Sequence, residues 1–324
     1  TGRRGRNYSA VKDKGWVVKV TSDGSIIPWA SGFRANNGIG MSPSGDLWVT
    51  DNQGDWRGTS PIYHVEKGHF YGHPSSLVWD PSFFPKNGDP LEFGVDRLNQ
   101  LRTPAAIQLP HGLVCNSPSE PVFDTTNGKF GPFKGQMMVG DIAAQRIIRV
   151  MPEKVRGVYQ GACAFLIENS GLRGGNNRLT FSPEGNALYV GQTYRGWGAP
   201  AEGLQRIVWN GVTPLEVRQM SITPGGFDLT FTKPIDADAA NDPDRYQIQS
   251  YRYSYGHKYG SPQLDKKVHI AKRVNVSEDK FTVSLKLDQV EAGKIYQIDL
   301  VNLFSSDGLP IINPMVCYTV NQLR

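Results

Sequence analysis

The chain has 324 residues, of which 36 are Gly and 22 are Pro, and its formal net charge is +5 at pH 7. This length supports two domains with their own cores, and the glycine and proline content indicates many turns. No run of about 18 apolar residues exists, so the sequence excludes a transmembrane helix.

The positive charge is concentrated at the start of the chain. Residues 1–14 hold five basic side chains against Asp13, whereas residues 214–324 hold thirteen basic and thirteen acidic side chains. Such a distribution is typical of a solvated basic arm and not of a surface that reads phosphates. We therefore expect residues 1–14 to form an arm, and we expect no nucleic-acid partner.

Residues 15–213 contain an internal repeat. The segment 37–49 recurs at 177–190 with Ser-Pro-x-Gly at the same offset, and a weaker third copy with an insertion covers 111–141. Each copy reads as an apolar strand, a tight turn and a second strand rich in β-branched and aromatic residues, which predicts a β-hairpin. Further strands are expected at these positions: 16–20, 62–65, 146–150 and 204–209. The pattern predicts a partial β-propeller with at least three blades of an expected six.

Polar residues cluster where the strands of these repeats end. Loops at strand ends form one face of a propeller, where ligands bind. We therefore expect the following residues to converge on one face, where they suit a polyhydroxylated or anionic ligand: Arg34, Asn37, Asp51, Asp55, His111, Asp141, Arg173, Asn177, Arg178, Arg195 and Trp197.

Several of these residues have two interpretations. Asp51 and Asp55 are candidate calcium ligands, but an Asx turn explains the same segment. His111 is a candidate general base, since imidazole titrates near neutrality, or a hydrogen-bonding turn residue. Trp197, between two glycines, either stacks on a sugar or fills a blade corner.

The remaining histidines and the cysteines are also ambiguous. His64, His69 and His73 have spacings that fit a metal site, but their Gly- and Pro-rich loop favours exposure to solvent. In an oxidising compartment Cys115 and Cys163 are candidates for a disulfide between neighbouring blades, with Cα atoms within about 7 Å. Cys317 is then expected to be buried. Three buried thiols are the alternative.

The composition changes at residue 214. Seven short alternating segments follow, separated by turn residues, and they predict a β-sandwich of about seven strands over 214–324. The runs GFDLTFTKPID and AGKIYQIDLVNLFSSDGLPI resemble bacterial immunoglobulin-like domains. The expected fold is therefore all-β, a partial propeller over 15–213 followed by an immunoglobulin-like sandwich.

Longer runs connect the whole chain to a known family. WVVKVTSDGSIIPWASGFR, GDLWVTDNQGDW, LPHGLVCNSPSEPVFD and DPDRYQIQSYRYSYGHKYGSP resemble exported bacterial β-propeller proteins grouped with the sorbosone and glucose dehydrogenases that use pyrroloquinoline quinone. The resemblance implies a periplasmic or extracellular protein and a cytochrome c partner, with haem supplied by another domain or chain. It also implies that a second chain or a missing N-terminal segment closes the propeller.

The resemblance extends to one candidate residue. Arg34 lies in Gly-Phe-Arg-Ala-Asn-Asn-Gly, which is similar to a Gly-x-Arg-Asn-x-x-Gly stretch of the quinoprotein sugar dehydrogenases, with Ala35 in place of Asn. There the arginine lies near the cofactor's carboxylates, which favours Arg34, Asn37, Arg173, Arg195 and Trp197 as cofactor-binding residues. Alternatively, Arg34 braces adjacent blades through backbone carbonyls.

Two functions are compatible with these features. The first is a sugar or alcohol dehydrogenase that uses pyrroloquinoline quinone and calcium, with His111 and Asp51 as catalytic residues and a cytochrome as electron acceptor. The second is a propeller scaffold that binds a glycan or a partner protein and catalyses no reaction.

Overall fold

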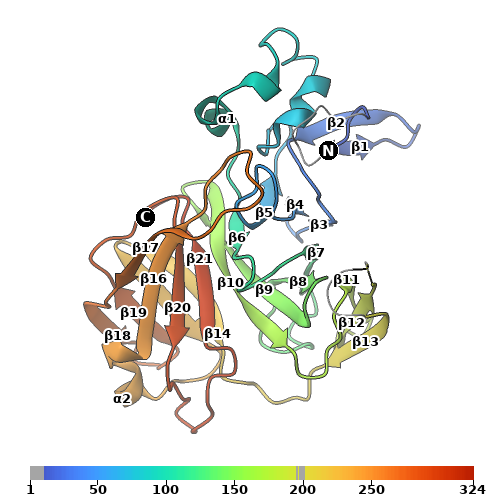
Figure 1. The fold of residues 1–324 in the computed structure, drawn as a ribbon. Coiled ribbons are helices and arrows are strands. Elements are labelled where there is room, and N and C mark those ends of the chain that lie inside the picture. The colour runs from blue at the N-terminus through green and yellow to red at the C-terminus, as the bar shows by residue number, and fades with distance from the viewer. Residues whose placement is uncertain (1–10, 195, 197–200) are drawn as a thin grey trace. The chain divides into compact units, whose positions relative to one another are not determined.

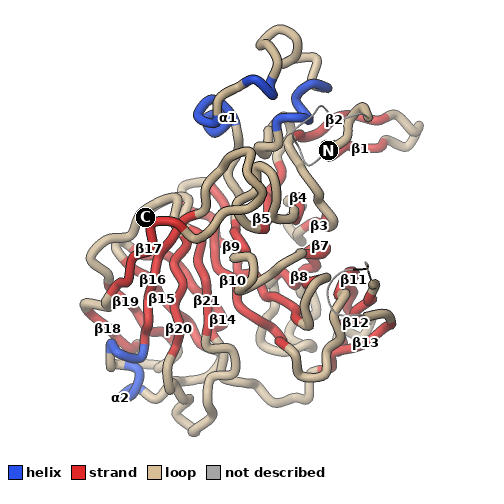
Figure 2. Tube along the Cα trace, in the orientation of Figure 1, coloured by secondary structure: helices blue, strands red, loops and turns tan. Residues whose placement is uncertain are grey.

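A computed structural model of the chain describes residues 11–194, 196 and 201–324 (Figure 1). Strands hold 44% of the residues and helices 7%, so the expected β-rich composition is confirmed (Figure 2). Among the described residues no helix exceeds the seven residues of α1 (Val95–Leu101). None of the described helices is long and apolar enough to span a membrane.

The described chain divides into two compact units. The first unit contains residues up to 121 together with residues 253–264, and the second contains 122–252 and 265–324. This division differs from the expected boundary between residues 213 and 214. The sequence between 253 and 264 gave no sign that it joins a unit formed by the first third of the chain.

The first unit contains two antiparallel sheets. One has two strands, β1 (Trp16–Val20) and β2 (Ile26–Ser31). The other has four strands in chain order, β3 (Gly38–Met41), β4 (Leu47–Thr50), β5 (Ser60–Val65) and β6 (Ile107–Leu109). Three short helices lie between β5 and β6, namely η1 (Pro74–Trp79), η2 (Pro90–Glu92) and α1. Phe33, Val49, Tyr63 and Tyr71 pack together in a core of this unit.

The second unit is built on an eight-stranded sheet with the order β17-β16-β20-β21-β10-β9-β8-β7. The strands of this sheet are β7 (Pro118–Phe123), β8 (Met137–Asp141), β9 (Arg146–Val155), β10 (Val158–Glu168), β16 (Tyr246–Arg252), β17 (Leu264–His269), β20 (Ile295–Leu300) and β21 (Met315–Thr319). The chain boundary between the units, after residue 121, falls within β7. The long hairpin of β9 and β10 therefore continues, through β21, into the strands of the C-terminal part of the chain.

Two smaller sheets complete the second unit. They are β11 (Asn176–Phe181), β12 (Ala187–Gln192) and β13 (Gly203–Val208), and β14 (Val217–Thr223), β15 (Gly226–Phe231), β19 (Thr282–Lys286) and β18 (Arg273–Val276). The helices α2 (Ala237–Ala240) and η3 (Pro243–Arg245) lie between β15 and β16.

The hairpins expected from the two strong repeats are present. β3 pairs with β4, and β11 pairs with β12, each across a turn whose glycine, Gly45 or Gly185, has a positive φ. The strands expected outside the hairpins, at 62–65, 146–150 and 204–209, are present as β5, β9 and β13. The third copy is different, because residues 111–117 form turns and its hairpin consists of β7 and β8. The apolar strand expected at the start of the third copy is therefore absent from residues 111–117.

The C-terminal strands form a sandwich. All seven expected segments contain a strand, and the structure adds β14, which the sequence pattern missed. Side chains of β14, β15 and β19 share one core with those of β16, β20 and β21. Met151, Val155 and Ala162 of the β9–β10 hairpin belong to the same core. This shared burial explains why the second compact unit extends across residue 214. The identification of propeller blades and of an immunoglobulin-like domain stays a prediction.

Candidate functional site

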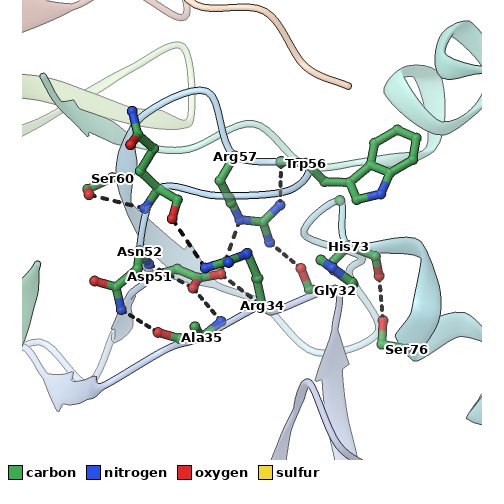
Figure 3. Close-up of polar contacts among 12 residues, drawn as sticks. Gly32, Arg34, Ala35, Asp51, Asn52, Trp56, Arg57, Ser60, His73 and Ser76 are labelled. Carbon is green, nitrogen blue, oxygen red and sulfur yellow. Dashed lines mark hydrogen bonds and ion pairs between the residues drawn. The ribbon is translucent and has the colours of Figure 1, made fainter. Parts of the chain in front are cut away.

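The loop after β4 carries a buried carboxylate that joins two loops of the first unit. Asp51 directly follows the strand and is fully buried. It accepts hydrogen bonds from the backbone N–H groups of Arg34, Ala35 and Asn52, each at 2.8 Å, and from Nε of Arg57 at 3.1 Å (Figure 3). These four N–H donors fix the loop after β2 to the loop after β4.

Arg57 completes this connection. Its side chain donates to the backbone oxygen of Trp56 at 2.9 Å and to that of Gly32, and it lies over the ring of Tyr63. Burial acts to lower the pKa of Arg57, but Tyr63 and Asp51 raise it, and the net shift is upward. Arg57 is therefore a permanent cation that pairs with Asp51 inside the protein.

A tight hairpin turn lies between these two charged residues. Gly54 and Arg57 form both backbone hydrogen bonds of the turn, with Asp55 and Trp56 at its tip. Trp56 has a φ of 61°, which is unusual for a bulky residue. A Cβ at Gly54 would lie 2.0 Å from Cζ of Arg34, so this position requires glycine for the arginine to approach.

Residues 253–264, which we call the cover segment, lie on this turn. Its backbone binds the turn through N–H of Trp56 to the oxygen of Gly256 at 2.8 Å and N–H of Gly260 to the oxygen of Gly54 at 3.0 Å. The Tyr255 ring packs on Trp56, and its hydroxyl donates to the backbone oxygen of Gly72 at 2.6 Å. A segment distant in sequence thus becomes part of the site.

Asp55 is the unusual member of the network. It is fully buried, and neither carboxylate oxygen has a hydrogen-bond partner among the described residues. Nη2 of Arg34 lies 3.8 Å from its Oδ2. The Arg34 guanidinium is also 5.1 Å from the ring centroid of Tyr259, a side chain that is 54% exposed. A buried carboxylate without hydrogen-bond donors requires an explanation, because its desolvation is costly.

His73 is also buried next to the network. The backbone N–H of His73 donates to the backbone oxygen of Gly32 at 2.9 Å. In the ring, Nδ1 is 2.9 Å from Oγ of Ser75. Nε2 has no hydrogen-bond partner among the described atoms. Burial and the positive charge of Arg57 hold the pKa of His73 well below its usual range, so the imidazole is neutral at pH 7. The expectation that His73 faces solvent is therefore wrong.

The three histidines expected as a possible metal site do not converge, although Nδ1 of His64 and Nδ1 of His69 lie 4.0 Å and 3.8 Å from Oε2 of Glu66. His64 contacts Asp46 at 3.2 Å through Nε2, whereas Nδ1 of His69 contacts Oγ1 of Thr103 at 2.9 Å. Within residues 11–194, 196 and 201–324, no group of three or more His, Cys, Asp or Glu side chains is arranged to hold a metal.

The other expected site residues are distributed over both units. In the first unit His111 is exposed, and its backbone N–H donates to Oγ1 of Thr59 at 2.8 Å, whereas Asn37 is half-buried just before β3. In the second unit Asp141 is buried and accepts from N–H of Ala143 at 2.9 Å. The structure therefore brings together Arg34, Asp51 and Asp55, and the convergence of all eleven residues stays a prediction.

Three further candidates belong to the second unit, and two lie outside the described residues. Arg173 donates from Nη1 to the oxygen of Glu202 at 3.1 Å, and Arg178 donates to the oxygen of Asn177 at 2.8 Å. Arg195 and Trp197 lie outside the described residues. Their assignment to a cofactor therefore stays a prediction.

Sequence reasoning missed Arg57 and the cover segment, and it expected His73 to face solvent. Arg57 follows the polar run at Asp51–Asp55 but gave no separate signal. The run YRYSYGHKYGSP departs from the strand alternation on either side of it. That departure was the available sign that the residues after Arg252, where β16 ends, do not belong to the sandwich sheets.

The network does not fit the cofactors implied by the resemblance. Its four charged residues are two arginines and two aspartates, so their charges cancel, and each arginine already faces a carboxylate. A quinone with carboxylate groups needs cations that are not already paired. Calcium needs six to eight oxygen ligands, whereas the oxygens of Asp51 are occupied by N–H donors.

Comparison with known proteins gives no family assignment. No established family profile and no curated protein match the sequence. Part of the chain has a distant similarity to solved structures of sugar dehydrogenases. The PQQ-bound aldose sugar dehydrogenase from Streptomyces coelicolor shares 14% identity at a TM-score of 0.38, covering 59% of this chain and 50% of that one. A protein from Thermus thermophilus described as an oxidoreductase (glucose dehydrogenase) shares 21% identity at 0.34, covering 56% and 47%.

A second kind of similarity is to bacterial surface-layer proteins. The S-layer protein SbsC shares 23% identity at a TM-score of 0.27, covering 34% of this chain and 14% of that one. The chain thus spans half or less of the length of each of these proteins. TM-scores this low leave the function to be argued from the residues themselves.

Proposed function

We propose that the first unit binds a polyhydroxylated ligand, such as an oligosaccharide, next to Tyr259 and Arg34, and that the chain is a binding module. The observation that supports this most strongly is Asp55, whose buried carboxylate has no hydrogen-bond donor among the described residues. Nη2 of Arg34 lies 3.8 Å from this carboxylate, and the same guanidinium lies over the exposed ring of Tyr259.

The chemistry of a sugar matches this arrangement. Sugar hydroxyls are hydrogen-bond donors, and an unsatisfied buried carboxylate costs about 1–3 kcal/mol or more. The apolar face of a pyranose packs on an aromatic ring, and Tyr259 presents such a ring at the exposed tip of the cover segment, beside exposed His257 and Lys258. Asp55 is fully buried, so a ligand reaches it only after side chains of this network move.

Catalysis has less support from the same contacts. Asp51 holds four N–H donors, so in this arrangement its lone pairs position the loops and are not directed at a substrate. His73 is neutral, as a general base must be, but it is completely buried. The quinoprotein dehydrogenase with His111 as base is therefore the second candidate, favoured by the sequence around Arg34.

The wider setting follows from the sequence resemblance. We place the protein in the periplasm or outside the cell. A cytochrome c partner belongs to the dehydrogenase candidate alone. A second chain or a further segment that closes a propeller ring is compatible with both candidates.

Binding can be tested by screening the protein on an oligosaccharide array and measuring the hits by isothermal titration calorimetry. We expect Tyr259→Ala to weaken binding at least tenfold, because the stacking ring is lost, and Tyr259→Phe to bind like the unmodified protein. Tyr194→Ala is the matched control, since Tyr194 is 44% exposed and lies in the second unit. Unchanged affinity in Tyr259→Ala, or no binding to any sugar, contradicts the proposal.

A second assay distinguishes binding from catalysis. Pyrroloquinoline quinone and calcium are added to the full chain, and the reduction of an artificial electron acceptor is followed with a panel of aldoses. We expect no reduction while sugar binding persists. Reduction that depends on both the quinone and an aldose would establish the dehydrogenase instead.

A further inference from the structure

We propose that Cys163 and Cys317 form a disulfide bond that joins β10 to β21 when the protein folds in an oxidising compartment. The two residues are directly opposite each other in the antiparallel pair formed by these strands. Both are 1% exposed. The proposal is independent of the function of the first unit.

The register provides the geometry that a disulfide needs. Directly opposed residues of antiparallel strands have Cα atoms about 4.5–5.5 Å apart, which lies within the range of about 4.4–6.8 Å found across disulfides. In the described structure the thiols are free and form a hydrogen bond with each other. The two sulfur atoms are therefore already neighbours, and the strands need no change of register.

The buried environment decides when the bond forms. The hydrogen bond to Cys163 and the burial of the side chain raise the pKa of the Cys317 thiol well above its usual range. Because the thiolate is the attacking species, the folded thiols react slowly. Oxidation therefore occurs during folding, before β21 packs between β10 and β20.

The oxidant is a small or protein disulfide, for example oxidised glutathione. One cysteine thiolate attacks the glutathione disulfide, which releases one glutathione thiolate and leaves a mixed disulfide on the protein. The second cysteine thiolate then displaces the other glutathione. Overall, two protein thiols become one disulfide, and one oxidised glutathione becomes two glutathione molecules.

The register also selects Cys317 over Cys115 as the partner of Cys163. Cys115 is buried in the first unit, whereas Cys163 and Cys317 share one sheet of the second unit. The pairing of Cys115 with Cys163 expected from the sequence requires a contact between units. The pair across β10 and β21 requires none.

The bond closes a long loop. Residues between Cys163 and Cys317 include every strand from β11 to β20. Cross-linking the ends of such a loop restricts the unfolded chain, so the disulfide is expected to raise the unfolding midpoint. The last strand of the chain would then stay attached to the long hairpin when other parts of the sandwich open.

The test uses the full chain produced both in a reducing cytoplasm and by export to an oxidising periplasm. Each sample is denatured, alkylated without reductant and analysed by intact and peptide mass spectrometry. We expect the exported protein to be about 2 Da lighter before alkylation. We also expect it to have one alkylated cysteine in place of three, to contain a peptide linking Cys163 to Cys317 and to lose the higher unfolding midpoint on reduction.

Variants provide the controls. Cys115→Ser should keep the linked peptide and the effect of reductant on the unfolding midpoint, whereas Cys163→Ser and Cys317→Ser should abolish both. The unmodified chain suffices if a variant fails to fold. Three alkylated thiols in the exported protein, or a peptide linking Cys115 to Cys163, would overturn the proposal.

Discussion

In the first unit Arg57 contacts Asp51 at 3.1 Å, and in the second unit Arg149 contacts Glu216 at the same distance. All four side chains are at most 3% exposed. The pairs differ in the number of groups that share the carboxylate. Asp51 accepts from four N–H donors, three of them from the backbone, whereas Glu216 accepts from Arg149 and from Asn313, through Nδ2 at 2.6 Å and through the backbone N–H.

The difference in donors accompanies a difference in protonation. Burial lowers the pKa of Arg149 despite its partner, whereas the pKa of Arg57 is raised in spite of burial, by Tyr63 and Asp51. Burial also raises the pKa of Glu216 to about 7, although Arg149 opposes this. The contact distance alone thus does not determine how well a buried ion pair is stabilised, because the surrounding donors compensate for the lost water.

The largest expected effect comes from removing each arginine in turn. Arg149→Met leaves Glu216 with donors from Asn313 and no cation, and we expect a loss of about 3–5 kcal/mol in the free energy of unfolding. Arg57→Met leaves Asp51 with three backbone donors, so we expect a smaller loss of about 1–3 kcal/mol. Urea unfolding followed by tryptophan fluorescence measures both values.

The control for these variants is Arg178→Met, which removes an exposed arginine from β11 and should change stability by less than about 0.5 kcal/mol. The comparison between the pairs fails if Arg57→Met is at least as destabilising as Arg149→Met. In that case the backbone donors around Asp51 do not compensate for the missing charge.

A smaller effect is expected from pH, through Glu216 of the second pair. The pKa of Glu216 is about 7 in the folded chain, against an ordinary value of 4.5. The folded state therefore binds this proton more tightly than the unfolded state. The resulting stability is fully present below about pH 4.5 and is lost as the pH rises to about 7.

Glu216→Gln isolates this contribution, because glutamine keeps the shape but does not titrate. We expect the free energy of unfolding of the unmodified chain, measured relative to that of the variant, to decrease between pH 5 and pH 7. A difference that stays constant or increases over this range would show that Arg149 keeps the carboxylate ionised.

The sequence predicts the strands much better than it predicts their assembly. The Ser-Pro-x-Gly turns specify the β3–β4 and β11–β12 hairpins because Pro sets φ and Gly permits a positive φ, and both effects are local. The alternation of apolar residues predicts the sandwich strands for a similar reason. Pairing of β10 with β21 depends on residues about 150 positions apart, and no local pattern specifies it.

The candidate site shows the same limit. The polar cluster at Asp51–Asp55 was visible in the sequence, because polar residues directly after an apolar strand lie in a loop. Its interpretation as a metal site did not anticipate that backbone N–H groups and Arg57 occupy the Asp51 oxygens. Those donors approach through the tertiary fold, as does the cover segment, so chain order could not reveal them.

The smallest expected effect comes from a change in the cover segment, which belongs to the surroundings of the first ion pair and not of the second. Tyr255→Phe removes the hydrogen bond to the Gly72 oxygen but keeps the ring on Trp56 and under Arg102. One hydrogen bond is worth about 0.5–1.5 kcal/mol, so global stability should fall by about that amount or less.

The local consequence is the sharper measurement, because Tyr255 also helps to raise the pKa of Arg57 and is thus part of the surroundings of the first pair. If the cover segment opens on its own, the amides of Trp56 and Gly260, which bind across it, should exchange with deuterium about fivefold faster in Tyr255→Phe. The amide of Ile298 in β20 should be unaffected. Equal acceleration at all three amides would mean that the cover segment opens only when the whole chain unfolds, and the first pair would then be enclosed as permanently as the second.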